Sequence, residues 1–177
     1  MDKIGKVISI LKKLDYHPKI DSFKDRLVIQ KTVSILESLD IKLGYEFSIH
    51  LRGPYCRELT EDIYENKTNV ENLRTNFDLS AKEEIGVMKY KEVTELDPDY
   101  LEIISTYFHY LLKEVKNEDD SIRSLKALKP HLSDSKIAVG ISKSKELLPP
   151  NGKQIDEMKK EFDEWDKATV TDLSKWD

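Results

Sequence analysis

Apolar residues recur at helical spacing at the start of the chain. In the first segment they lie three or four positions apart with lysines between them, which predicts an amphipathic helix that stops before Pro18. A second helix is expected to begin between Ser22 and Asp25, because either side chain can cap its first turn, and to end at Asp40. The apolar positions of the first helix are Ile4, Val7, Ile8, Leu11 and Leu14.

The hydrophobic period changes at residue 45. Apolar and polar residues alternate over 45–51, which is the pattern of a half-buried β-strand. The dipeptide Gly53-Pro54 is expected to end this strand as a turn. A short helix over residues 59–63 follows, and the polar stretch 65–72 is expected to form a loop.

Capping signals predict further helices in the second half of the chain. Residues 80–83, Ser-Ala-Lys-Glu, have the spacing of a capping box, and Asp97-Pro98 is an N-cap followed by proline at the first helical position. The apolar series from Leu101 to Val115 then predicts a long buried helix. A short helix closes at Pro130, and a last helix, capped by Ser133, reaches residue 148.

Composition narrows the class of protein. The 177 residues suffice for one domain with its own core, and 6 Gly and 6 Pro leave little turn material for a β-sandwich. The single Cys excludes an internal disulfide and a cysteine zinc cluster, and it suits a reducing cytosol. No apolar run approaches the ~18 residues that span a membrane, so we expect a cytoplasmic protein without a membrane partner.

Charge is distributed unevenly. The net charge of −5 argues against a chain that binds nucleic acid mainly by neutralising phosphates. The sequence 149–152, Pro-Pro-Asn-Gly, marks a boundary between a domain over 1–148 and an acidic helical tail over 149–177. Eight carboxylates against five lysines give this tail −3, whereas residues 1–31 carry eight basic and four acidic side chains.

Three motifs in the first third of the chain resemble a known family. They are Leu-Val-Ile-Gln-Lys at 27–31, Gly-Tyr-Glu-Phe at 44–47 and a Gly-Pro-Tyr tripeptide at 53–55. This combination resembles the YwgA-like family and is similar to the toxin-neutralising domain of DarG-type antitoxins and to the SocA-like (Panacea) antitoxin domain. The resemblance covers residues 5–148. It implies a mainly α fold with a small antiparallel β element, a winged-helix-like helical domain, and a role as antitoxin or adaptor without an active site.

The polar residues of these motifs are candidates for partner binding. Arg52, Tyr55 and Arg57 can form a surface for carboxylates or phosphates, because arginine makes forked hydrogen bonds to both. In the alternative interpretation, Gln30 and Tyr55 only tie the helix to the turn through internal hydrogen bonds.

The tail offers a second candidate binding element. Its apolar residues fall on one stripe of a helix, which either anchors in a partner's groove or folds back on the domain. The candidate anchors are Met158, Phe162, Trp165 and Trp176.

Nucleic-acid binding is the alternative. A winged-helix reader of DNA could place Lys12, Lys13, Arg26 and Lys31 on phosphates, whereas a solvated helix face explains the same lysines and arginine without a ligand.

Signals for catalysis are absent from the sequence. There is no metal-binding histidine pair and no glycine-rich phosphate loop, so neither a metal nor a cofactor is expected. Cys56 is expected to be a small buried residue rather than a reactive thiol. An enzyme would need a deep pocket that gathers His50, Arg52 and Tyr55.

These observations predict a non-catalytic protein-interaction module. It is expected to be antitoxin-like and to neutralise a partner protein of the toxin kind, either as a monomer or as a homodimer. The alternative is a winged-helix DNA-binding transcriptional regulator.

Overall fold

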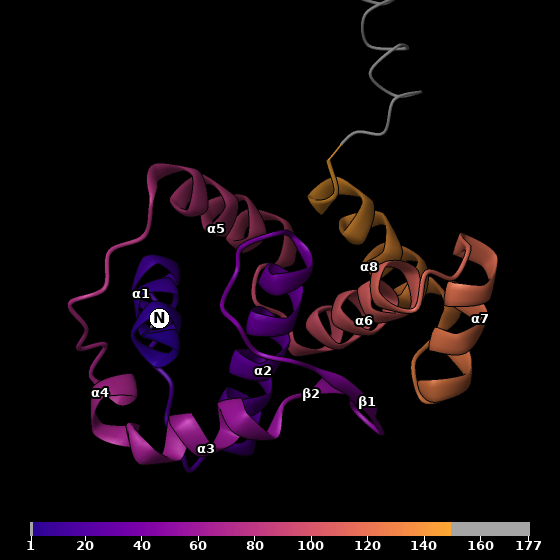
Figure 1. Ribbon diagram of the computed structural model, residues 1–177. Helices are drawn as coiled ribbons and strands as arrows, with labels where there is room; N and C mark the ends of the chain where they lie inside the picture. Colours follow the sequence, from indigo (N-terminus) through magenta and orange to yellow (C-terminus); the bar gives the residue numbers. More distant parts are fainter. Residues whose placement is uncertain (1, 150–177) are drawn as a thin grey trace, which may run out of the picture. The chain divides into compact units, whose positions relative to one another are not determined.

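The computed structural model describes residues 2–149 of the chain (Figure 1). This part is mainly helical and contains one two-stranded antiparallel sheet, so the predicted fold class is confirmed. The helices are α1 (Lys3–Leu14), α2 (Phe23–Ser38), α3 (Arg57–Glu65), α4 (Lys67–Glu71), α5 (Ala81–Thr94), α6 (Pro98–Phe108), the π-helical turn η1 (His109–Lys113), α7 (Glu118–Leu128) and α8 (Asp134–Leu147). The strands are β1 (Ser48–His50) and β2 (Gly53–Tyr55).

The predicted helix starts are confirmed at their capping residues. Ser22 caps α2 by accepting a hydrogen bond from the backbone N–H of Asp25. At α5, Ser80 and Glu83 form the predicted capping box, in which each side chain accepts from the other residue's backbone N–H. Asp97 caps α6 from the position before Pro98. These caps are local contacts, which is why the sequence alone indicates them.

The hairpin differs from the strand expected over residues 45–51. Tyr45 and Phe47 are buried, as the alternation predicts, but pairing starts only at Ser48. The prediction of a turn at Gly53-Pro54 is wrong. Both residues belong to β2, where Pro54 lies opposite Ile49, and the turn is formed by Leu51 and Arg52. Proline fits here because β2 is an edge strand, which needs no N–H on its open side.

Two further expectations are corrected. The polar stretch 65–72 is not a loop, because it contains the short helix α4, which buries Val70. The buried helix from Leu101 ends earlier than predicted. After Phe108 it continues as the π-helical turn η1, and Leu112 and Val115 are exposed. A π-turn inserts extra backbone into the helix, which shifts later side chains off the original face.

Helix α6 forms the centre of the core. It packs against α2 on one side and α8 on the other, with α7 and β2 also in contact (Figure 1). Gly140 permits the close approach of α8, because a Cβ at this position would lie 2.5 Å from Cγ2 of Ile103. The apolar residues of α6 that are fully buried are Leu101, Ile103, Ile104, Tyr107 and Phe108. Burying each such side chain contributes about 1.5–3 kcal/mol, so α6 is the main source of stability for the elements around it.

The described part of the chain ends close to the expected domain boundary. Helix α8 stops at Leu147, and the residues Met1–Leu147 form one compact unit. The predicted acidic tail, with Met158, Phe162, Trp165 and Trp176, lies outside the described residues. None of the helices over residues 2–149 has the length and hydropathy that a bilayer span requires.

Candidate functional site

A cavity of about 540 Å³ lies beside the hairpin, and we call it the hairpin pocket. Helix α2, the hairpin and α3 supply its walls. It is lined by Phe23, Arg26, Leu27, Gln30, Lys31, His50, Leu51, Arg52, Gly53, Tyr55, Thr60 and Tyr64. The lining includes three basic side chains and a histidine but no carboxylate, so the pocket suits an anionic group.

Gln30 fixes α3 against α2 at the back of this pocket. Its Nε2 donates to the carbonyl oxygen of Cys56 at 2.8 Å, and its Oε1 accepts from the backbone N–H of Cys56 at 3.0 Å. Gln30 Nε2 also donates to Thr60 Oγ1 at 2.9 Å. The structural interpretation of Gln30 is therefore confirmed. Tyr55 behaves differently, since its ring meets the edge of the His50 ring at a centroid distance of 5.3 Å.

Lys31 lies at the buried end of the pocket. Only 3% of the residue is exposed, so its expected place on an exposed basic face is wrong. The reason is its position in α2 behind the hairpin, where its Nζ donates to the carbonyl oxygen of Pro54 at 2.7 Å. Burial, together with the nearby charges of Lys129 and Arg52, lowers the pKa of Lys31 to about 7, and Glu102 opposes this shift.

The carboxylate of Glu102 lies beneath the hairpin and forms ion pairs with both Lys129 and Arg52. Glu102 of α6 is buried, accepts from Lys129 Nζ at 2.5 Å and lies 3.4 Å from Nη1 of Arg52. The sequence analysis missed Glu102 and Lys129. The signal that could have found Glu102 is a charged residue on the apolar face of a predicted buried helix, because such a carboxylate needs a buried partner.

Lysine side chains also hold the hairpin segment by its backbone. Besides Lys31, Lys129 Nζ lies 3.4 Å from the carbonyl oxygen of Leu51. Lys113 of η1 donates to the carbonyl oxygen of Phe47. Three lysines from three different parts of the chain thus position the hairpin relative to the helices.

Two arginines of the pocket lie close to an exposed aromatic ring. The guanidinium of Arg52 lies 5.0 Å from the centroid of the Phe23 ring, and that of Arg26 lies 5.9 Å from the same ring. Arg26 also approaches the Tyr64 ring and donates to the carbonyl oxygen of Ile20 at 2.6 Å. Both distances to Phe23 are within the range of cation–π contacts.

The predicted partner-binding residues are only partly brought together. Arg52 and Tyr55 line the hairpin pocket, whereas Arg57 lies outside it and pairs with Glu61 one helical turn later. The pocket does gather His50, Arg52 and Tyr55, the three residues that an enzyme interpretation would require.

The predicted nucleic-acid-binding residues do not form one surface. Lys12 is exposed on α1, Lys13 pairs with Glu84 of α5 at 2.9 Å, and Arg26 and Lys31 belong to the hairpin pocket. Acidic residues of α5 pair with two of the eight basic side chains of residues 1–31, because Lys6 pairs with Glu83 in addition. The ion pair and Ser80 lower the pKa of Glu83 to about 2. Lys6 and Lys13 are therefore engaged by carboxylates, whereas Lys12 stays exposed.

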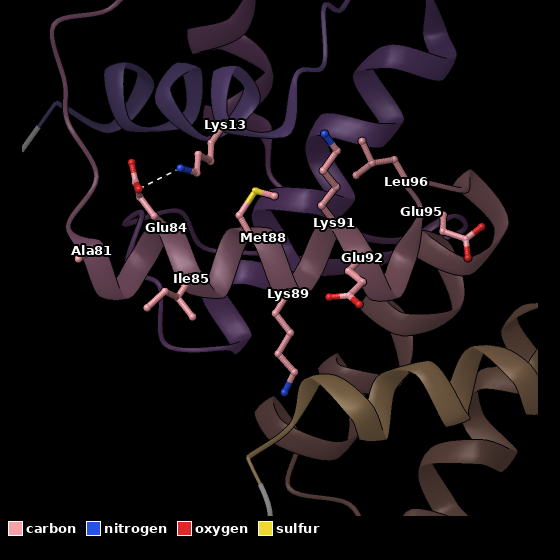
Figure 2. Close-up of a pocket in the computed structure, with 10 residues that line it drawn as sticks. All are labelled: Lys13, Ala81, Glu84, Ile85, Met88, Lys89, Lys91, Glu92, Glu95 and Leu96. Atoms are coloured by element: carbon pink, nitrogen blue, oxygen red, sulfur yellow. Dashed lines mark hydrogen bonds and ion pairs between the residues drawn. The ribbon is translucent and has the colours of Figure 1, made fainter.

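A second hollow, of about 990 Å³, lies along α5. Figure 2 shows Lys13 reaching from α1 to Glu84 at its edge. Its lining contains three lysines and three glutamates and therefore has no net charge, so charge favours neither an anionic nor a cationic ligand. The residues that line it are Lys13, Ala81, Glu84, Ile85, Met88, Lys89, Lys91, Glu92, Glu95 and Leu96.

Two nucleophilic side chains near the hairpin, those of Cys56 and Ser48, do not line the pocket. Cys56 is buried as the N-cap of α3, where its Sγ accepts from the N–H of Leu59 at 3.4 Å, and burial raises the pKa of its thiol. His50 lies 3.2 Å from Ser48 Oγ, but Ser48 does not line the pocket. Over residues 2–149, no three His, Cys, Asp or Glu side chains come together as a metal site would need.

Comparison of the chain with protein-family models, with curated proteins and with solved structures found no match, so the resemblance to YwgA-like proteins stays a prediction.

Proposed function

We propose that this chain is a non-catalytic protein-interaction module of the antitoxin kind, which acts in the cytoplasm and docks a partner protein on the hairpin. The observation that carries the proposal is the set of large apolar side chains exposed around the hairpin pocket. Leu51 at the hairpin turn is 82% exposed, and Phe23 and Tyr64 are 54% and 48% exposed. Together with Arg26 and Arg52 they have the composition of an interface centre, where aromatic residues and arginine are enriched.

The chemistry of the hairpin also indicates what the partner presents. Basic side chains without a carboxylate in the lining favour a partner segment with acidic residues. The acidic tail is a second docking element in this proposal, since its predicted apolar stripe can anchor in a groove. The lone cysteine, buried and free, suits a reducing compartment.

The test is a quantitative pull-down with the full chain from its native host. We compare the wild type with Leu51→Ser and with Ile85→Ser, which removes an exposed apolar side chain on α5 away from the hairpin. The expected result is a captured protein whose yield falls at least tenfold for Leu51→Ser and is unchanged for Ile85→Ser. Equal capture by all three forms contradicts docking on the hairpin.

The captured protein is then expressed alone and together with the chain. An antitoxin predicts that the partner arrests growth when expressed alone, that the wild-type chain restores growth and that Leu51→Ser does not. A partner that never arrests growth argues against the antitoxin assignment. Salt-dependent binding of duplex DNA that is lost when Lys12, Lys13 and Arg26 are neutralised would favour the alternative, a DNA-binding regulator.

A further inference from the structure

The hairpin pocket contains more positive charge than its surroundings neutralise. Arg26, Lys31 and Arg52 line it, and no Asp or Glu does. Within the described residues, only Arg52 among these three has an ion-pair partner, which is Glu102 at 3.4 Å. Glu102 is already paired with Lys129. A group that enters the pocket therefore meets basic side chains and no carboxylate in the lining, and a negative charge on that group is stabilised.

The buried end of the pocket has spare hydrogen-bond donors. The ammonium group of Lys31 can donate three hydrogen bonds, and one of them goes to the carbonyl oxygen of Pro54. No second acceptor for this ammonium is present over residues 2–149. A buried donor without an acceptor is costly, so an oxygen of an anionic ligand that accepts from Lys31 would remove this cost.

The mouth of the pocket is aromatic. The guanidinium groups of Arg26 and Arg52 both lie close to the Phe23 ring, at 5.9 and 5.0 Å from its centroid, and Arg26 also lies 5.7 Å from the centroid of the Tyr64 ring. Phe23 is more than half exposed, so its ring is accessible to a ligand. Such a ring, together with planar guanidinium groups, offers a stacking surface to a flat ligand.

From these three observations we infer that the hairpin pocket binds a small aromatic anion, a ring that carries a phosphate or carboxylate group. The anionic group is held by Arg52 and Lys31, and the ring lies against Phe23 and Tyr64. The cavity of about 540 Å³ has the size of a small-molecule site, since such sites span roughly 300–1,000 Å³. This site does not depend on the protein partner proposed above, although a bound ligand would occupy part of the same docking surface.

Calorimetric titration of the full chain with phenyl phosphate tests the inference. Inorganic phosphate, which has the charge alone, and phenol, which has the ring alone, are titrated in parallel. We expect saturable one-to-one binding of phenyl phosphate and at least tenfold weaker binding of the other two. Titration with benzoate tells whether the pocket accepts a carboxylate as well as a phosphate. A pocket that accepts both groups binds benzoate, whereas a pocket that accepts only phosphate does not.

Two variants locate the binding. Arg52→Gln removes a charge from the pocket at an exposed turn position, so folding should be unaffected, which thermal unfolding verifies. Arg57→Gln is the matched control, since Arg57 lies five residues further along the chain and outside the pocket. We expect at least a tenfold loss of affinity for Arg52→Gln and none for Arg57→Gln.

The inference is overturned if neither phenyl phosphate nor benzoate binds at millimolar concentration. It is also overturned if Arg52→Gln binds as well as the wild type, or if phenol binds as tightly as phenyl phosphate. None of these results affects the pull-down with Leu51→Ser, so the ligand site and the protein interface can fail separately.

Discussion

Lys31 illustrates how much the role of one side chain depends on residues far away in the sequence. In the chain it is one of eight basic residues in the N-terminal segment, and its place in the motif at 27–31 does not show that its ammonium group is buried. In the fold it is buried behind β2, close to two other cations, Lys129 and Arg52. Its position next to the hairpin, rather than the charge of its own segment, determines what it can contact.

The lowered pKa of Lys31 predicts a pH-dependent stability. The folded-state pKa is about 7 and the ordinary value is 10.5, so between these values the unfolded chain binds a proton that the folded chain does not. The free energy of unfolding should therefore rise with pH from 7 to 9.5, by up to about 1.4 kcal/mol per pH unit. Below pH 7 Lys31 is protonated in both the folded and the unfolded chain, so its contribution to the free energy of unfolding no longer changes with pH. Burial is the largest cause of the lowered pKa, and Lys129, Glu102 and Arg52 are the charged groups that contribute to it.

Lys31→Met isolates this effect. Urea denaturation at several pH values gives the free energy of unfolding for the wild type and for the variant. The free energy of unfolding of the wild type should rise relative to that of the variant as the pH rises from 7 to 9.5, because methionine does not titrate. Parallel curves for the two proteins over this range would show that Lys31 stays charged in the fold.

At the level of single residues, the sequence identified Arg52 and Tyr55 as part of the candidate site because they belong to a compact motif. It did not identify Phe23, Glu102 or Lys129. Phe23 is the first residue of α2, and Glu102 and Lys129 come from α6 and from the segment after α7. No local pattern links positions that are up to about a hundred residues apart, so only the fold shows that they share one site.

Among the elements, helices were easier to predict than the hairpin, for a physical reason. A capping residue such as Ser22 or Ser80 contacts atoms within three or four positions, so its effect can be recognised in a short window. The hairpin depends on distant partners. Gly53-Pro54 resembles a turn locally, but β2 lies against α2 and α6, and these contacts determine where pairing begins.

Gly53 provides a test of how tightly the hairpin is packed. Its φ of +87° is in the left-handed region, and a Cβ would lie 2.3 Å from Oγ1 of Thr106 in α6. Gly53→Ala should therefore lower the free energy of unfolding by about 1–3 kcal/mol, through backbone strain and this clash. Chemical denaturation measures the change.

Gly86→Ala is the control for this substitution. Gly86 lies inside α5, and its new Cβ would meet only the end of the flexible Ile41 side chain, at 3.0 Å. Because alanine favours helix by about 1 kcal/mol over glycine, this variant should keep or raise the stability. Similar losses for both variants would mean that the hairpin position is no more constrained than an ordinary helix position.

For the whole molecule, the structure predicts that the domain folds without the tail. The buried apolar residues from Val7 to Leu147 belong to one compact unit that is complete within the described residues. A chain that stops after Pro149 should therefore unfold cooperatively, with a Tm within a few degrees of the full chain. Differential scanning calorimetry of both forms is the measurement. A broad transition or a fall of more than about 10 °C, roughly 2.5–5 kcal/mol for a domain of this size, would mean that the tail completes the core.

The lysine contacts that hold the hairpin have a consequence for motion. Two strands of three residues each are too short to be stable by themselves, and lysine amines are among the groups that attach the hairpin segment to the helices. Each amine regains water when the hairpin lifts away, which offsets much of the lost hydrogen bonding. The native ensemble should therefore include conformers in which the hairpin has opened while α6 and its neighbours stay folded. The part of the molecule with the best-developed binding chemistry is then also the part that can rearrange around an arriving partner without unfolding the rest.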